Sequence, residues 1–176
     1  MIIYFLRHAS AGEHVMNPKK DEKRALDQTG IEQCGYVGRA LAALDVHVDV
    51  IISSPLKRAT QTASLVGNEM GYEGKLALDD ALKPGASVDD FRRLVDKHGK
   101  REAIMVVGHN PNLSEFLGRS ISESGCEASF DFKKGAVARV ETSRNSGTLS
   151  WSMTPKILRT LYVAATESSR PKTSPK

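Results

Sequence analysis

Short apolar runs alternate along this chain with longer segments in which apolar residues recur at helical spacing. The runs at 2–6 and 103–107 are almost wholly apolar, and a third run at 48–52 is rich in Val and Ile. Continuous runs of this length are typical of strands buried on both faces of a parallel sheet. The alternation of such strands with helices predicts an α/β fold, a three-layer sandwich with a mainly parallel sheet.

Four segments between and after these strands are predicted as helices, at 29–44, 55–70, 88–98 and from Pro111 to about 119. Thr29 is the expected N-cap of the first helix, with Glu32 three residues later as its capping-box partner. Pro55 is suited to the first turn of the second helix, and Ser87 is the expected N-cap of the third. The short apolar stretch 76–82 fits no single element type.

The last third of the chain predicts a different kind of pairing. Residues 136–140 and 148–153 alternate in polarity around a polar turn at 143–147, which predicts a hairpin that adds an antiparallel edge to the sheet. We assign residues 1–166 to one domain, a common size for a single core, and residues 167–176 to a basic tail of disordered composition.

Charge and composition exclude several classes of function. The pI near 9.1 suggests nucleic-acid binding, but the segment from Lys156 onward carries the whole net charge of +4, and residues 1–155 hold 20 basic and 20 acidic side chains. A solvated tail is therefore the preferred interpretation, and no nucleic-acid partner is expected. No apolar stretch is long enough for a membrane span or a signal peptide, so we expect a cytoplasmic monomer. Cys34 and Cys126 have no metal-binding or disulfide spacing and are expected to be free thiols.

Polar residues suited to phosphate follow three of the predicted strands. Arg7 and His8 come directly after the first strand, Arg58 lies in the helix after the second, and His109 follows the strand at 103–107. Each alone also fits an ordinary loop or surface position, or a histidine satisfied within the core. Together they favour chemistry, because the carboxyl ends of parallel strands form the ligand crevice and a guanidinium matches phosphate oxygens.

These residues lie in motifs that resemble the histidine phosphatase superfamily. The resemblance is carried by Arg7-His8, by the long block Ser54-Pro55-Leu56-Lys57-Arg58-Ala59-Thr60-Gln61-Thr62-Ala63, and by Gly108-His109. The stretch from Asp21 through Arg24 to Gly30 is similar to that of the SixA-type phosphohistidine phosphatases. The resemblance covers residues 1 to about 165 and implies a phosphoglycerate mutase-like fold.

The resemblance also implies a mechanism that needs no metal and no cofactor. A neutral His8 would attack phosphorus and form a phosphohistidine that water hydrolyses, while Arg7, Arg58 and a protonated His109 surround the phosphate oxygens. Opposite protonation states in the two imidazoles predict a bell-shaped pH profile. Further candidates for binding the substrate are polar residues of the neighbouring loops, namely Ser10, Asn17, Arg24 and Asn110.

Two departures from the superfamily pattern bear on the substrate. Ala9 replaces the usual glycine after the histidine, and Ala81 stands where many members carry a general-acid glutamate, with Asp79 and Asp80 as candidate substitute acids. An alkoxide leaving group benefits from a proton donor, whereas an imidazole leaves more easily. We therefore expect a phosphatase that acts on phosphohistidine of a signalling or phosphotransfer protein. The alternatives are a small-molecule phosphomonoesterase of the same fold and a catalytically silent phosphate-binding module.

Overall fold

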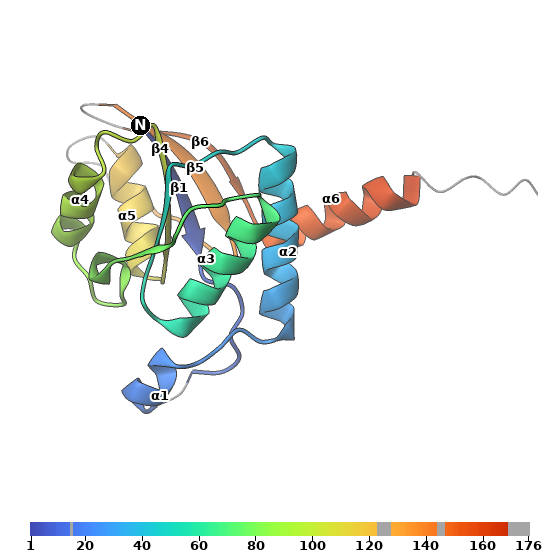
Figure 1. The fold of residues 1–176 in the computed structure, drawn as a ribbon, viewed down its shortest axis with the longest axis horizontal. Coiled ribbons are helices and arrows are strands. Elements are labelled where there is room, and N and C mark those ends of the chain that lie inside the picture. Colours follow the sequence, from blue (N-terminus) through green and yellow to red (C-terminus); the bar gives the residue numbers. More distant parts are fainter. Residues whose placement is uncertain (15, 123–127, 144–146, 169–176) are drawn as a thin grey trace, which may run out of the picture.

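A six-stranded mixed sheet forms the centre of the computed structural model, which describes residues 1–14, 16–122, 128–143 and 147–168. The strand order is β3-β2-β4-β1-β5-β6 (Figure 1). The strands are β1 (Ile2–Arg7), β2 (Val50–Ser53), β3 (Ala77–Leu78), β4 (Ala103–Gly108), β5 (Val137–Thr142) and β6 (Gly147–Met153).

The central strands run parallel, as the apolar runs predict. β1 pairs with β4 in parallel, and β4 and β3 both pair with β2 in parallel. β5 lies antiparallel on the other side of β1 and forms a hairpin with β6, so the predicted antiparallel extension is confirmed. The carboxyl ends of β1, β2 and β4 consequently meet at one edge of the sheet.

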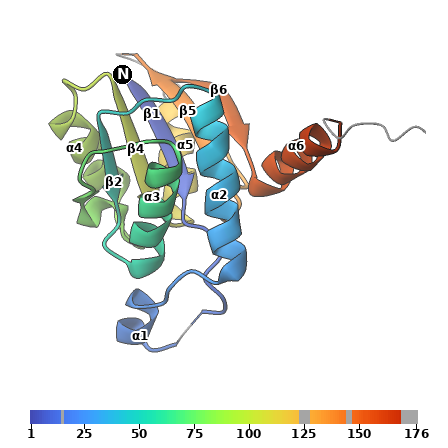
Figure 2. The ribbon, with the colours of Figure 1, turned by 45° about the vertical axis from the view of Figure 1, so that its right-hand side comes forward.

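Helices cover both faces of this sheet and complete the predicted three-layer sandwich (Figure 2). One face carries α2 (Gln28–Ala43) and α3 (Lys57–Glu69), and the other carries α4 (Val88–Lys97) and α5 (Asn112–Ile121). Alternate residues of β1 point to opposite layers: Tyr4 and Leu6 pack in the core under α2 and α3, whereas Ile3 and Phe5 pack in the core under α4 and α5. Burial on both faces explains why the strand sequence is continuously apolar.

The helix starts agree with the sequence in one case and correct it in another. Ser87 caps α4 in a full capping box with Asp90, as predicted for that position. The N-cap of α2, however, is Asp27 rather than Thr29, because the Asp27 carboxylate accepts a hydrogen bond from the Gly30 amide at 2.7 Å. The prediction of Thr29 and its capping box was therefore wrong by two residues.

Two helices have no counterpart in the sequence prediction. The short helix α1 (Pro18–Glu22) lies within the polar stretch before α2, beyond the carboxyl ends of the strands (Figures 1 and 2). Helix α6 (Pro155–Ser168) projects away from the sheet and packs its first turns against α2. Because α6 continues to Ser168, the proposed boundary between domain and tail at 166/167 falls inside a helix. The rest of the predicted tail lies outside the described residues.

Smaller predictions are resolved as follows. The apolar stretch 76–82 divides into β3 and a 3₁₀ helix, η1 (Asp80–Leu82). Cys34 is a buried free thiol, and burial raises its pKa to about 12, whereas Cys126 lies outside the described residues. Within the described ranges, no helix is long and apolar enough to cross a membrane.

Candidate active site

The structure brings two histidines together at the carboxyl edge of the sheet. His8 follows β1 and His109 follows β4, and the parallel register of these strands places Arg7 beside Gly108. The ring centroids of His8 and His109 are 4.9 Å apart. Both side chains are buried, and Arg58, from the first turn of α3, is buried with them. The three strand ends singled out by the sequence therefore converge as expected for a ligand crevice.

A backbone carbonyl fixes the tautomer of His8. The Nδ1 atom lies 2.8 Å from the carbonyl oxygen of Ala9, which can only accept a hydrogen bond. Nδ1 must then carry the proton, and the lone pair of the neutral ring is on Nε2. This arrangement prepares Nε2 of His8 for attack on an electrophile such as phosphorus.

Donors with unused hydrogen-bonding capacity surround the histidine pair. The Nε atoms of Arg7 and Arg58 and the Nδ1 atom of His109 are buried and make no hydrogen bond to any described residue. An unsatisfied buried polar group typically costs about 1–3 kcal/mol. Phosphate oxygens are the natural acceptors for two guanidinium groups and an imidazole, so this donor set fits a phosphoryl group.

A buried threonine connects the loop of His8 to the helix of Arg58. The Oγ1 atom of Thr62 accepts a hydrogen bond from the Ala9 amide at 3.1 Å and donates one to the Arg58 carbonyl at 2.7 Å. Ala9 itself is fully buried and packs within the core. The methyl group that replaces the usual glycine hydrogen is therefore accommodated by the core.

Both imidazoles are neutral in the field of the protein alone. Burial is the largest cause, and the positive charges of Arg58 and Arg7 add to it, so that the pKa of His8 falls to about 4. Burial and the proximity of His8 lower the pKa of His109 to about 2. The expectation of a protonated His109 does not hold in the field of the protein alone, because desolvation disfavours the charged ring. A phosphate dianion between the two arginines would oppose this effect.

Three of the four predicted substrate-binding residues make hydrogen bonds within the segment between β1 and α2. Arg24 donates to the Asp21 carboxylate at 2.8 Å and to the carbonyl of Ala11 at 2.9 Å. Asn17 caps α1 at the surface by accepting from the Lys20 amide, and Ser10 donates to the Asp27 carboxylate at 2.7 Å. These hydrogen bonds organise the segment after His8.

Asn110, the fourth predicted residue, directly follows His109 in the chain. Its Nδ2 atom donates to the Phe132 carbonyl at 3.0 Å, and Arg7 donates to the same oxygen at 2.7 Å. Its Oδ1 atom is buried without a described partner. Asn110 therefore shares an anchor with Arg7.

The two candidate acids near Ala81 are engaged away from the histidine pair. The Asp79 side chain accepts from the Ala81 amide at 3.0 Å and caps η1. The exposed Asp80 pairs with Lys83 at 2.9 Å. Neither carboxylate forms a hydrogen bond or an ion pair with His8, His109 or Arg58 among the described contacts.

Sequence reasoning missed two residues that shape the site. The Asp21 carboxylate accepts from Arg58 at 3.0 Å, and the Asp21 carbonyl accepts from the same nitrogen at 2.9 Å. The Ser54 hydroxyl lies 2.9 Å from Nε2 of His109. Both residues belong to the quoted motifs, so their place in those motifs was the signal available in the sequence.

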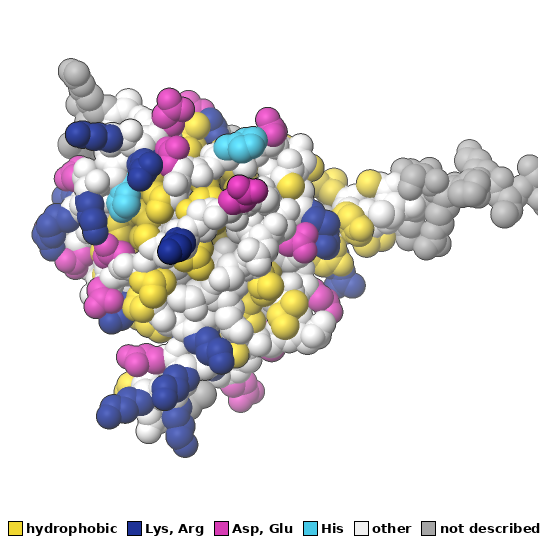
Figure 3. Space-filling view, in the orientation of Figure 1, with side chains coloured by type: hydrophobic (Ala, Val, Ile, Leu, Met, Phe, Trp, Pro, Cys, Tyr) yellow, Lys and Arg dark blue, Asp and Glu magenta, His cyan; other side chains and the backbone are white. Residues whose placement is uncertain are grey.

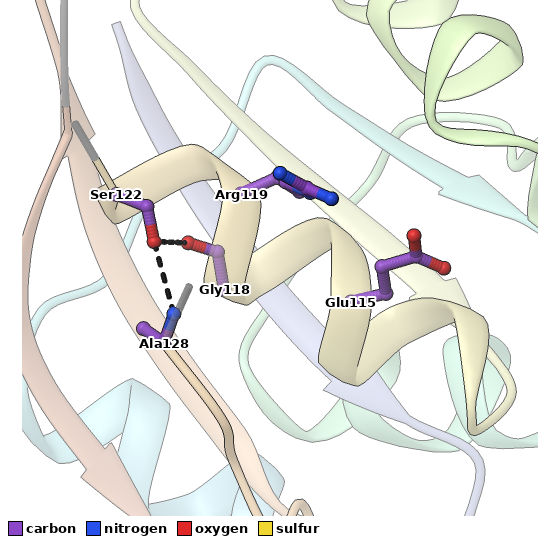
Figure 4. Close-up of a pocket in the computed structure, with 5 residues that line it drawn as sticks. All are labelled: Glu115, Gly118, Arg119, Ser122 and Ala128. Carbon is purple, nitrogen blue, oxygen red and sulfur yellow. Dashed lines mark hydrogen bonds between the residues drawn. The ribbon is translucent and has the colours of Figure 1, made fainter. Parts of the chain in front are cut away.

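A hollow elsewhere in the molecule is separate from these residues. It lies at the C-terminal half of α5 and is lined by Glu115, Gly118, Arg119, Ser122 and Ala128 (Figure 4). The Ser122 hydroxyl donates to the Gly118 carbonyl and accepts from the Ala128 amide. In the part of the chain that the structure describes, no group of three or more His, Cys, Asp or Glu is arranged to hold a metal ion.

Comparison with known proteins identifies the family of this sequence. The family model described as histidine phosphatase superfamily (branch 1) matches residues 3–83. An uncharacterised protein of Picosynechococcus is 30% identical over 66% of this chain and 70% of its own length. The serine/threonine-protein phosphatase Pgam5 of Drosophila persimilis is 37% identical over 49% of this chain, which spans only 29% of that protein. The chain belongs to the histidine phosphatase superfamily, and this membership supports a hydrolase of the phosphatase class.

Solved structures confirm the predicted fold. The protein histidine phosphatase SixA, complexed with tungstate, superposes with a TM-score of 0.79 over 89% of this chain and 98% of its own, at 22% identity. A phosphoglycerate mutase from Bacillus anthracis superposes with a TM-score of 0.69 over 90% of this chain and 95% of its own, at 15% identity. The architecture is thus phosphoglycerate mutase-like.

Proposed function

We propose that this protein removes phosphate from phosphohistidine carried by a signalling or phosphotransfer protein. The observation that carries the proposal is that, among the described residues, neither candidate acid contacts the histidine pair. Ala81 stands at the position of the superfamily glutamate, and its neighbours Asp79 and Asp80 are bound elsewhere. A leaving imidazole needs less help from an acid than a leaving alkoxide does.

The carboxylate that does reach the site is suited to a different role. Asp21 accepts hydrogen bonds from both Arg58 and Arg24. Two guanidinium partners favour the ionised carboxylate, which accepts hydrogen bonds and has no proton to give. Asp21 therefore orients Arg58 and does not replace the missing acid.

The reaction follows from the tautomer of His8. Its Nε2 lone pair attacks phosphorus in line, and a bond forms between Nε2 and phosphorus. The bond from phosphorus to the substrate ring breaks, and its electron pair returns to the ring nitrogen. The ring leaves as neutral imidazole because its other nitrogen is protonated. Arg7, Arg58 and His109 stabilise the charge on the oxygens in the transition state. Water then cleaves the phosphorylated His8, releasing inorganic phosphate. The protein histidine phosphatase SixA, which has the same fold, forms a complex with tungstate, a tetrahedral oxyanion like phosphate, and this supports a phosphoryl group as the ligand here.

A comparison of substrates tests the proposal. We expect kcat/KM for a phosphohistidine peptide to exceed that for sugar phosphates by at least about tenfold, since a positioned general acid is commonly worth about a hundredfold on an alkoxide. Wild-type enzyme denatured in alkaline detergent should carry a base-stable, acid-labile phosphate label that is missing in His8→Asn. Faster turnover of sugar phosphates would favour the phosphomonoesterase, and tight phosphate binding without label or turnover would favour a silent binding module.

A gain-of-function variant makes the test sharper. Ala81→Glu restores the carboxylic acid at the superfamily position, and Ala81→Gln is its matched control without an acid. We expect the glutamate variant alone to raise hydrolysis of alkyl phosphates while phosphohistidine hydrolysis changes little. An equal gain on both substrates, or the same gain with glutamine, would contradict the argument from the leaving group.

A further inference from the structure

Helix α1 carries an exposed basic face beside the site. Lys19, Lys20 and Lys23 are exposed, and none forms an ion pair with another described residue. The space-filling view shows Lys and Arg side chains gathered over the end of the molecule that α1 occupies (Figure 3). Glu22 is the exposed acidic residue of the same helix, so the exposed charge on this short element is mainly positive.

We call Arg7, Arg58 and His109 the phosphate clamp, and contacts of Asp21 and Arg24 hold this basic face beside it. The inward-facing Asp21 accepts from Arg58 at 3.0 Å, and Arg24 ties the end of the segment to the Ala11 and Gly12 carbonyls. At 100° per helical residue, Lys19 and Lys23 lie on the side of the helix opposite Asp21. The same element thus contacts the phosphate clamp with one side and presents lysines to solvent with the other.

A further lysine adds to the positive charge at this edge. Lys57 is exposed at the first residue of α3 and directly precedes the buried Arg58. Equal numbers of basic and acidic side chains occur in residues 1–155 as a whole, so the excess of lysine on α1 is a local feature. A macromolecule that delivers a phosphoryl group to His8 approaches the carboxyl edge of the sheet, where these lysines are exposed.

We propose that the basic face of α1, formed by Lys19, Lys20 and Lys23, docks an acidic surface that surrounds the phosphohistidine of a protein substrate. The inference rests on the proposed function and adds the chemical character of the partner. Charges at the rim of an interface act mainly by steering the encounter and excluding partners of the same sign. Because the lysines are exposed, their effect is screened over a distance of about 8 Å at physiological ionic strength.

The test uses three synthetic peptides of equal length, each with a central histidine flanked by Glu, by Gln or by Lys. Chemically phosphorylated peptides report kcat/KM, and the unphosphorylated, fluorescently labelled peptides report Kd by anisotropy. Phosphoramidate serves as a small substrate without flanking side chains that α1 could bind. Each measurement is made at low and at high salt.

The variants compare charge reversal on α1 with the same change elsewhere. K19E/K20E/K23E reverses the basic face, and K19Q/K20Q/K23Q neutralises it without adding repulsion. The matched control, K75E/K100E/K156E, makes the same change in net charge at exposed lysines outside α1, two in loops and one on α6. Retained phosphoramidate turnover shows that each variant is folded.

The wild-type protein should prefer the Glu-flanked over the Gln-flanked peptide by about tenfold at low salt, the product of three exposed pairs of ordinary strength. High salt should remove most of this preference. Both α1 variants should lose it and the control should keep it, while phosphoramidate turnover stays within about twofold in all of them. Equal wild-type Kd values for the Glu- and Gln-flanked peptides, or the same loss in the control, would overturn the docking proposal. Failure of the wild type to hydrolyse phosphohistidine would instead count against the proposed function, because the Kd comparison requires no turnover.

Discussion

Asp27 is the residue on which we expect the segment between His8 and α2 to depend most. Its carboxylate accepts three hydrogen bonds, from the Ser10 hydroxyl, the Gly12 amide and the Gly30 amide, each at 2.7 Å. Burial opposes ionisation, but these hydrogen bonds outweigh it and lower the pKa of Asp27. The Asp27→Ala variant removes all three contacts together with the N-cap of α2.

The magnitude of the loss follows from these contacts. Removing an N-cap typically costs about 0.5–2 kcal/mol, and hydrogen bonds to a charged group contribute about 1.5–3 kcal/mol each when well buried. Because Asp27 is only half-buried, we discount the second contribution and expect a total loss of about 2–3 kcal/mol in the free energy of unfolding. For a chain of 176 residues, unfolding entropies of about 2.1 cal/mol/K per residue translate this into a fall in Tm of about 5–8 °C.

Urea unfolding followed by circular dichroism measures this change, with two variants as controls. Asp27→Asn keeps an acceptor for the cap but removes the charge, and we expect about half of the loss. Thr29→Ala removes the cap that the sequence pattern suggested, and we expect less than about 0.5 kcal/mol because the structure gives Thr29 no capping role. The reasoning is refuted if Asp27→Ala is as stable as wild type or if Thr29→Ala is destabilised as strongly.

Two further predictions concern the histidine pair and its support. Thr62→Val should cost about 1–3 kcal/mol in stability and also lower kcat, because it leaves the buried Ala9 amide without an acceptor and frees the loop of His8. Thr62→Ser should restore both stability and kcat. A Thr62→Val variant with unchanged stability and kcat would contradict this role. The fold lowers the pKa of His8 to about 4 and that of His109 to about 2. Below about pH 6.5 the unfolded chain therefore binds protons that the folded chain does not bind. The stability that these two histidines contribute is complete above that pH and falls as acid is added. For His8 alone, the free energy of unfolding should fall by on the order of 3 kcal/mol between pH 6.5 and pH 4. Urea titrations across this range should show a shallower pH dependence of stability in a His8→Asn, His109→Asn double variant. An unchanged slope would argue against neutral imidazoles.

Except for the short strand β3, the sequence was sufficient for the strands of the sheet and for the convergence of the site, because both depend on local patterns. β1 and β4 are apolar on both faces, which places them in the centre of a parallel sheet, and the residues that follow them must meet at one edge. The N-cap of α4 was also predictable, since its capping box joins Ser87 to Asp90, three residues along the same helix.

The sequence failed where tertiary contacts decide the local structure. Asp27 caps α2 in place of Thr29 because its carboxylate also holds the loop after His8, a contact that no local pattern records. Helix α1 has no buried residues and only one turn, so it has no apolar periodicity, and Asp21 holds it in place through Arg58. The protonation of His109 depends on burial and on the neighbouring His8, which a motif does not contain.

The protonation of the site has a consequence for how it treats phosphate. The positive charge that faces the histidines comes from Arg7 and Arg58, whose guanidinium groups stay charged at any physiological pH. Both imidazoles are neutral until an anion arrives, so His8 keeps the Nε2 lone pair that attack requires, and the Ala9 carbonyl prevents the ring from adopting the other tautomer. A bound phosphate dianion favours protonation of the histidine with an unpaired buried nitrogen, which is His109. In the proposed reaction, binding itself therefore produces the division between a neutral nucleophile and a charged donor that the resemblance implies, without a separate acidic residue.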